Sequence, residues 1–316
     1  MQRTRVGLAK RHNRRDNIYG AMDLVRDDLI PRITDQVMLK PNFLSNKNQL
    51  ASSHPDAMRG AIDFLLSCPK PPSEILIAEG GNEDYPGESF DNFGYPALLD
   101  EYDIPIRLID LNRETEWETI TIYLHDRSEY LVHIPKTVLD CPCTISVAIA
   151  KTHDVCCVTL ALKNMIMGTI RKEDRVKMHG YPEHKTRELP TESQRMAVNL
   201  TRLSHILKPD IGVIDGTVGL QGNGPGGEDA VELGVAAAGA DVYAVDAVMA
   251  NAMGFEPMSL GWLHYANDLD LGIANLENIE VLETAIEDIA ISFKPHEKNE
   301  QQLQWQDKEA KTYLSV

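Results

Sequence analysis

Short apolar runs alternate with helical patterns along the first 110 residues, and this alternation constrains the fold more than any other feature of the chain. The predicted strands lie at 5–9, 36–39, 74–78 and 104–108, and the predicted helices at 17–29 and 55–66. Strands that alternate with helices of 10 to 15 residues form βαβ units and a mainly parallel sheet. The sequence therefore predicts an α/β protein with mainly parallel sheets and flanking helices.

The rest of the chain continues this pattern around a hairpin and a long polar segment. Residues 117–134 alternate as an antiparallel hairpin added to the sheet, and 143–150 is the most apolar run, which predicts a central strand. Residues 168–195 are polar without a clear period, which is typical of a long functional loop. We expect two lobes with a cleft between them, followed by a polar tail that is frayed or disordered. The predicted division is 1–145, 146–294 and 295–316.

The charge balance restricts the partners of this chain. Thirty-one Lys and Arg against 48 Asp and Glu give a formal net charge of −17, which repels nucleic acids and anionic membranes. No apolar run is long enough to span a bilayer, and the basic N-terminus lacks the apolar core of a secretory signal. The five cysteines are an odd number, which argues against a disulfide framework and for a reducing cytoplasm. The sequence predicts an acidic cytoplasmic protein and is compatible with a homodimer.

Polar side chains follow several of the predicted strands. Lys40 and Asn42 lie at the end of the predicted strand 36–39, and Lys151 follows the central strand. His54 opens the predicted helix 55–66. The carboxyl ends of parallel strands form the ligand crevice of such sheets, and a helix N-terminus attracts anions. These four residues are candidates for binding an anion, and Asp215, after another strand, is a candidate for orienting them. In the alternative interpretation strands end in ordinary polar turns and His54 is a plain helix cap.

The segment 151–179 carries the densest set of reactive side chains. Lys163 lies in an apolar run, where desolvation lowers an amine pKa and favours a nucleophile or covalent anchor; the alternative is a lysine that reaches solvent. His153 and His179 are candidate proton-transfer groups or metal ligands, although their spacing matches no zinc motif. Asp246 lies in an apolar helix and needs a cation, backbone donors or the cleft as its partner. Together with Asp215, it is a candidate for orienting the cationic groups of the site.

Several motifs together resemble domain-of-unknown-function family 362. They are MLKPN (38–42), SSHP (52–55), IAKTH (149–153), VTLALKNMIMG (158–168), MHG (178–180), IDG (214–216), QGNGPGG (221–227) and AGADVYAVDAVMANAMGFEP (238–257). The resemblance covers residues 5–290 and implies no particular activity, since the family name states none. Many members carry a ferredoxin module, but the C-x₂-C-x₂-C-x₃-C motif is absent here, so no iron–sulfur cluster is expected. Gln221 stands where members usually have Glu.

A more remote similarity is to lactate racemase-like proteins that carry a nickel-pincer nucleotide. Lys163 lies ten positions after His153, and His179 lies sixteen positions after Lys163. This spacing is similar to that of the family's His, cofactor-anchoring Lys and nickel-ligating His. The resemblance implies a covalent cofactor on Lys163 or a divalent metal at His179 or His153. Gly81 and Asn82 replace a further family histidine, which argues against transferring its two-histidine chemistry.

These observations favour an enzyme that acts on a small anionic metabolite through a Lys/His cluster. The expected chemistry is isomerase- or racemase-like, or related acid–base catalysis, with His153, Lys163 and His179 as catalytic residues. The alternative is a non-catalytic accessory protein that delivers a metal or redox cofactor to a partner and docks through its acidic surface and the 168–195 loop.

Overall fold

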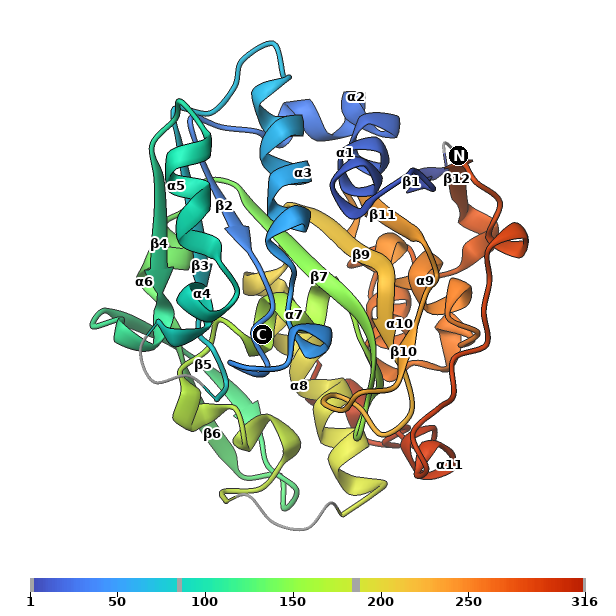
Figure 1. The fold of residues 1–316 in the computed structure, drawn as a ribbon. Helices are drawn as coiled ribbons and strands as arrows, with labels where there is room; N and C mark the ends of the chain where they lie inside the picture. The colour runs from blue at the N-terminus through green and yellow to red at the C-terminus, as the bar shows by residue number, and fades with distance from the viewer. Residues whose placement is uncertain (1–2, 84–86, 184–187, 315–316) are drawn as a thin grey trace.

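The computed structural model describes residues 3–83, 87–183 and 188–314, and one ten-stranded sheet forms the centre of this part of the chain. Strands β2, β3, β4, β7 and β9 run parallel, whereas β11 is antiparallel to both β9 and β1. Figure 1 shows β7 in the middle, between β2 and β9. The order along the sheet is β12 (Ile279–Glu283), β1 (Thr4–Ala9), β11 (Val235–Gly239), β9 (Ile211–Leu220), β7 (Thr144–His153), β2 (Gln36–Lys40), β3 (Glu74–Glu79) and β4 (Ile106–Asp110), with β8 (Cys157–Thr159) on β7 and β10 (Ala230–Val231) on β9.

Helices bury both faces of this sheet, which explains why its strands are continuous apolar runs. On β2, Val37 and Leu39 pack in one cluster with the first set of helices, whereas Met38 packs in a second cluster with the other set. The first set is α1 (Arg14–Leu24) and α3 (Pro55–Leu66), and the second is α7 (Ala161–Met167), α8 (Thr191–Leu207), α9 (Val242–Ala252) and α10 (Gly261–Asp268). The predicted α/β class, with a mainly parallel sheet and flanking helices, is confirmed.

Strands from both predicted lobes belong to this one sheet. The predicted boundary between residues 145 and 146 falls inside β7, and β1 pairs with β11 and β12 from the other end of the chain. The central position predicted for residues 143–150 is confirmed, because every residue of β7 is buried.

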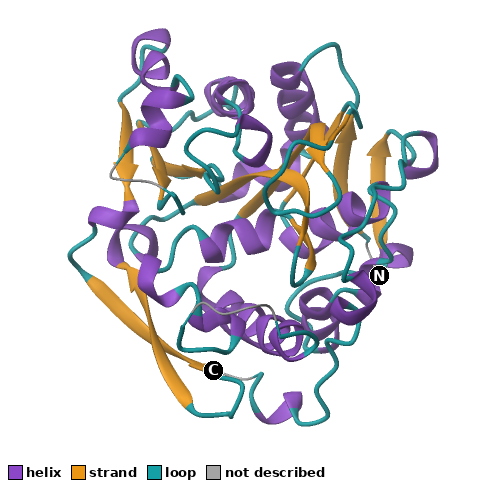
Figure 2. Cartoon of the chain, turned by 60° about the horizontal axis from the view of Figure 1, so that its bottom comes forward, coloured by secondary structure: helices purple, strands orange, loops and turns teal. Residues whose placement is uncertain are grey.

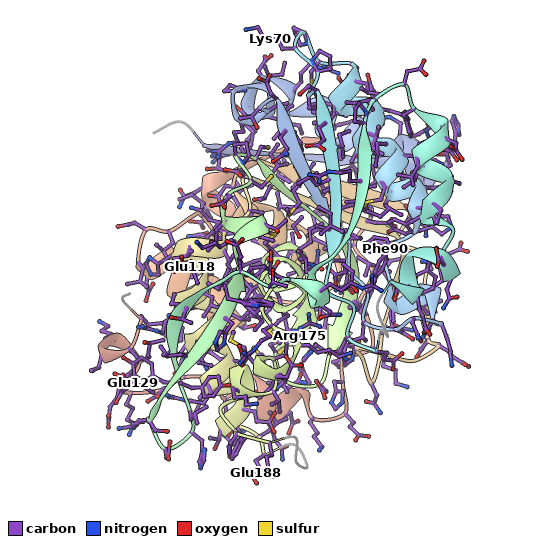
Figure 3. All side chains as sticks on the ribbon, turned by 90° about the vertical axis from the view of Figure 1, so that its left-hand side faces the viewer. Lys70, Phe90, Glu118, Glu129, Arg175 and Glu188 are labelled. Atoms are coloured by element: carbon purple, nitrogen blue, oxygen red, sulfur yellow. The ribbon has the colours of Figure 1, made fainter. Side chains whose placement is uncertain are left out.

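The predicted hairpin forms, but its addition to the main sheet was wrong. Strands β5 (Trp117–Tyr123) and β6 (Glu129–Pro135) make a separate antiparallel sheet, which Figure 2 shows as a pair of long strands apart from the others. Glu118 and Glu129 mark this hairpin in Figure 3, and Arg175 lies beside it toward the middle of the molecule. The hairpin packs on α8, where the Asn199 side chain donates a 3.0 Å hydrogen bond to the Tyr123 carbonyl.

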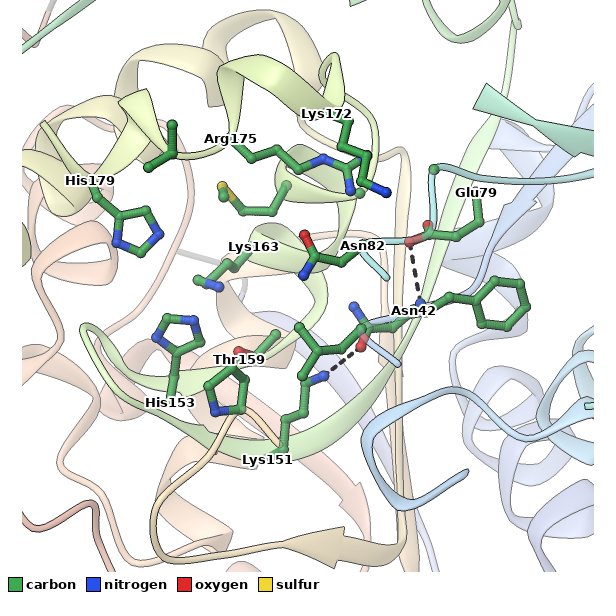
Figure 4. Close-up of a pocket in the computed structure, with 17 residues that line it drawn as sticks. Asn42, Glu79, Asn82, Lys151, His153, Thr159, Lys163, Lys172, Arg175 and His179 are labelled. Atoms are coloured by element: carbon green, nitrogen blue, oxygen red, sulfur yellow. Dashed lines mark hydrogen bonds between the residues drawn. The ribbon is translucent and has the colours of Figure 1, made fainter. Parts of the chain in front are cut away.

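The segment 168–195 is mostly irregular where the structure describes it, and residues 184–187 lie outside the described part. It contains the short 3₁₀ turns η5 (Lys172–Asp174) and η6 (Lys177–His179), and α8 begins at Thr191 within it. These two turns lie over the carboxyl end of the sheet and bring Lys172 and His179 to the site described below (Figure 4).

The prediction of a frayed tail after residue 295 was wrong for the described residues. Trp305 is 5% exposed and packs edge-to-face on Tyr265 of α10, with 5.2 Å between the ring centroids. The Trp305 indole donates a 2.5 Å hydrogen bond to the Ser259 carbonyl, so apolar burial and a polar contact both hold this segment. Among the described residues, no helix has both the length and the apolar character that crossing a bilayer requires.

Candidate functional site

A cavity of about 510 Å³ opens at the carboxyl ends of β2, β3 and β7. Parallel strands end at the same edge, so the residues that follow them converge there with α7 and the 172–179 segment. Figure 4 shows the polar side chains that line this cavity. They are Asn42, Glu79, Asn82, Lys151, His153, Thr159, Lys163, Lys172, Arg175 and His179.

Five of the residues predicted from sequence meet in this cavity. They are Asn42, Lys151, His153, Lys163 and His179. Lys151 is 1% exposed, and its ammonium donates to the Asn42 side-chain oxygen at 2.6 Å and to a backbone carbonyl at 2.8 Å. Burial and the neighbouring Lys163 charge hold the pKa of Lys151 well below its usual range. A bound anion would stabilise the charged form of this amine.

The expectation that Lys40 binds an anion directly was wrong. Its side chain is fully buried beneath the cavity wall and forms an ion pair with Glu79 and a 3.2 Å hydrogen bond to Asn164. Burial lowers the pKa of Lys40 and raises the pKa of Glu79, and the contact between the two charges opposes both shifts. Lys40 ends β2 and Glu79 ends β3, and these two strands pair side by side. The pairing of the strands therefore brings Lys40 and its carboxylate partner together.

His54 and Asp215 lie in a separate cavity of about 180 Å³, away from Lys163. Asp215 forms an ion pair with Arg14 at 2.5 Å. Arg14 was not among the site residues predicted from the sequence. The His54 ring accepts the Asp56 backbone N–H at 3.1 Å, so the plain-cap interpretation holds for His54. Burial and the Arg14 charge lower the pKa of His54.

Asp246 was predicted to orient cationic groups, but none of the cationic side chains that the structure describes contacts it. Its carboxylate accepts the backbone N–H groups of Ala161 and Leu162, at 2.8 and 3.2 Å, at the start of α7. Burial raises the pKa of Asp246 to about 7, and these two hydrogen bonds oppose that shift. Asp246 thus holds the helix that carries Lys163, and backbone donors are the partners that its burial required.

The two histidines face the same cavity with different hydrogen-bond partners. The Nδ1 atom of His179 lies 3.0 Å from a Glu192 carboxylate oxygen, and donation to that oxygen leaves Nε2 of the neutral ring as a proton acceptor. The Nδ1 atom of His153 accepts the Val155 backbone N–H at 3.0 Å, which leaves the proton on Nε2. The Asp154 carboxylate lies 3.1 Å from the same Nδ1 atom.

Lys163 points toward the space between the two imidazole rings, whose centroids are 6.4 Å apart (Figure 4). Lys163 is 5% exposed and lines the cavity. The described residues contain no group of three His, Cys, Asp or Glu side chains arranged to hold a metal ion.

Sequence reasoning did not select Glu79, Lys172, Arg175 or Glu192 as site residues. Glu79 directly follows a predicted strand, and this was the signal available for it. Lys172 and Arg175 lie in the polar loop, where nothing in the local pattern distinguishes them from solvated charges. Glu192 is the second residue of α8 and lies 13 residues from His179 in the sequence, so only the tertiary structure pairs them.

Comparison with known proteins identifies the family. The chain is 24% identical over 238 residues to a thylakoid-associated protein (sll1697) of Synechocystis sp., a match that covers 72% of this chain and 65% of the relative. It also superposes on the lactate racemase apoprotein from Thermoanaerobacterium thermosaccharolyticum with a TM-score of 0.45 and 13% identity, over 76% of this chain and 54% of that one. The chain thus spans less than two thirds of the length of either protein. The model of a domain of unknown function, DUF362, matches residues 37–251 and includes most of the cavity wall, and the chain belongs to this family.

Proposed function

We propose that this protein is an enzyme that binds a small anionic metabolite in the 510 Å³ cavity and moves a proton on it. The observation that carries the proposal is the pair of buried histidines with opposite hydrogen-bonding states beside a buried lysine. His179 presents an unprotonated Nε2 when neutral, whereas His153 presents a protonated Nε2. A base and an acid in one cavity suit isomerase- or racemase-like proton transfer.

The lysines supply the electrostatic part of this chemistry. Lys151 and Lys163 line the cavity next to the histidines and would bind the anionic group of the metabolite. When His179 removes a proton from a carbon next to a carboxylate or carbonyl, negative charge develops on the adjacent oxygen. Buried cations beside that oxygen stabilise it more strongly than water-exposed cations do. Glu192 is 3% exposed and would favour the imidazolium that His179 becomes.

Proton exchange with solvent tests this function directly. The purified protein is incubated in D₂O with a panel of 2-hydroxy and 2-oxo carboxylates, and the loss of each C–H signal is followed by proton NMR. We expect exchange in at least one compound and a loss of about 10²-fold or more in His179→Gln. His205→Gln, on the exposed face of α8, is the matched control and should retain the wild-type rate. Exchange that is equal in both variants would refute the role of His179.

The covalent-anchor role of Lys163 is tested on the protein purified from its native host. An intact mass above the sequence value, mapped to Lys163 by peptide analysis, would establish a covalent cofactor. A cofactor of this kind would supply electrophilic or redox chemistry, and the histidines would still hold and move the proton. An unmodified mass would limit Lys163 to electrostatic stabilisation of the bound anion.

A further inference from the structure

One buried hydroxyl in the cavity wall lacks a hydrogen-bond partner. Thr159 is 4% exposed, and its Oγ1 atom has no partner among the described residues. Most buried polar side-chain atoms in proteins are hydrogen-bonded, because an unpaired one loses its water without replacement. Of the described residues that carry such an unpaired atom, Thr159 is the one that lines the 510 Å³ cavity. A ligand in the cavity is therefore the partner that can satisfy this hydroxyl.

The pairing of β8 with β7 places Thr159 beside two residues of the proposed site. In this antiparallel pair Thr159 lies directly opposite Lys151, and His153 lies two positions farther along β7. Opposite residues share one face of a ladder, with Cβ atoms about 4.5–5.5 Å apart, and the diagonal neighbour lies on the same face. Lys151, His153 and Thr159 all line the cavity, and Figure 4 shows Thr159 between the other two.

A threonine on the other face of β7 has a protein partner. Thr152 lies between Lys151 and His153 in the sequence, so its side chain leaves the opposite face of the strand. There its hydroxyl donates a 2.9 Å hydrogen bond to the Gly222 carbonyl. The hydroxyl of Thr159 differs in that its side chain is turned to the cavity, where the described protein groups supply no such acceptor.

A side-chain rotation makes the Thr159 hydroxyl available to a ligand. Neighbouring atoms cover Oγ1 in the observed rotamer. A turn of about 120° about the Cα–Cβ bond moves this oxygen to another staggered position without moving the main chain. Because a hydrogen bond to an anionic oxygen is stronger than one to a neutral oxygen, an anionic group offsets the cost of the rotation best.

We infer that the Thr159 hydroxyl binds the anionic group of the metabolite, a carboxylate or a phosphate, and donates a hydrogen bond to one of its oxygens beside Lys151. This inference rests on the proposed function and adds a neutral donor to the two lysines. The long lysine side chains attract an anion through their charge, whereas a hydroxyl on a short side chain fixes the position of one oxygen. An anionic group fixed in this way holds the reacting carbon in place at the histidines.

Calorimetric titration of the full chain tests this inference, with lactate, pyruvate and inorganic phosphate as the probes. Thr159→Val removes the hydroxyl and keeps the branched shape, whereas Thr159→Ser keeps the hydroxyl. The matched control is Thr169→Val. Thr169 is 1% exposed and its Oγ1 atom also lacks a partner among the described residues, but it lies outside the cavity wall. Thermal melting verifies that each variant is folded.

We expect Thr159→Val to raise the Kd of the probes that the wild type binds by about 10- to 100-fold, the effect of losing a hydrogen bond to a charged group. Thr159→Ser and Thr169→Val should bind like the wild type. The melting temperature of Thr159→Val without a probe should be unchanged or higher, because valine removes an unpaired buried hydroxyl. Weaker binding of lactate or pyruvate identifies a carboxylate as the group that Thr159 binds, and weaker binding of phosphate identifies a phosphate.

Two results would overturn the inference. One is a Kd that Thr159→Val leaves unchanged for every probe that the wild type binds. The other is an equal loss of affinity in Thr169→Val, which would show that the effect does not come from the cavity wall.

The outcome separates this inference from the proposed function. In D₂O, Thr159→Val should exchange at the wild-type rate once the compound is saturating and differ in KM, whereas His179→Gln loses the rate itself. Exchange with an unchanged KM in Thr159→Val refutes only the role of Thr159. Weaker probe binding by Thr159→Val without exchange in the wild type refutes only the catalytic role of the histidines. If no probe binds the wild type, both proposals are refuted for small carboxylates and phosphate.

Discussion

Replacing Asp246 with Asn should change how the stability of this protein depends on pH. The Asp246 carboxyl is fully buried and accepts two backbone hydrogen bonds at the start of α7. Burial raises its pKa from an ordinary 3.8 to about 7 in the folded protein, against the opposing effect of these hydrogen bonds. The unfolded chain therefore releases this proton at a lower pH than the folded protein does.

The sign and size of the effect follow from proton linkage. Below pH 3.8 the carboxyl is protonated in both states and the raised pKa has no effect on stability. As the pH rises toward 7 the folded state alone retains the proton, so the free energy of unfolding falls, and the loss is complete above the folded pKa. The two pKa values correspond to about 4 kcal/mol in total, of which about 3 kcal/mol is lost between about pH 5 and 8.

Urea unfolding of the wild type and of Asp246→Asn at pH 5 and pH 8 measures this contribution. The amide cannot titrate, so any fixed cost of the substitution cancels when the two pH values are compared. We expect the wild type to lose about 3 kcal/mol more than the variant over this interval. Asp100→Asn, at an exposed carboxyl, should keep the wild-type dependence. Parallel pH profiles for the wild type and Asp246→Asn would refute the reasoning.

Three further substitutions test the site and its supports. Glu192→Gln should slow proton exchange about 10²-fold without lowering the melting temperature. The Gln amide can donate a hydrogen bond to Nδ1 of His179, which would move the ring proton to Nε2 and remove the base. An unchanged exchange rate would contradict this. Gly168→Ala places a Cβ atom 2.6 and 2.7 Å from the Glu79 oxygens, so urea unfolding should report a loss of about 1–3 kcal/mol, and no loss would show that the ion pair can move. Trp305→Ala should cost about 3–5 kcal/mol in the same assay, and an unchanged unfolding midpoint would contradict the docking of the tail.

Local patterns were sufficient for most of the fold. Apolar runs predicted the strands and the central position of β7, because a strand buried on both faces needs an unbroken series of apolar side chains. The hairpin was also predicted from its alternation, but its placement was not. That placement depends on contacts with α8, such as the one between Asn199 and Tyr123, which lie 76 residues apart.

Part of the site was predictable for a similar reason. Lys151 and His153 end one strand and Asn42 follows another, so the edge of a parallel sheet brings them together whatever the details of packing. Lys163 and His179 follow within the same stretch of chain. The Lys/His cluster is thus a consequence of strand order and short connections, which the sequence pattern already contains.

Partners distant in the sequence were decided by the tertiary structure alone. The sequence predicts Lys40 as an anion ligand, whereas in the structure it forms an ion pair with Glu79. The sequence also predicts that Asp246 orients cationic groups, whereas in the structure its carboxylate accepts backbone N–H groups at the start of α7. Trp305 belongs to a polar segment whose few apolar side chains show no period, yet it is buried. The sequence by itself determined which residues reach the edge of the sheet. Only the tertiary structure determined which of their charges are neutralised by protein groups and which can bind a ligand. The reason is that the free energy of a buried charge depends on the polar groups that replace its hydration shell.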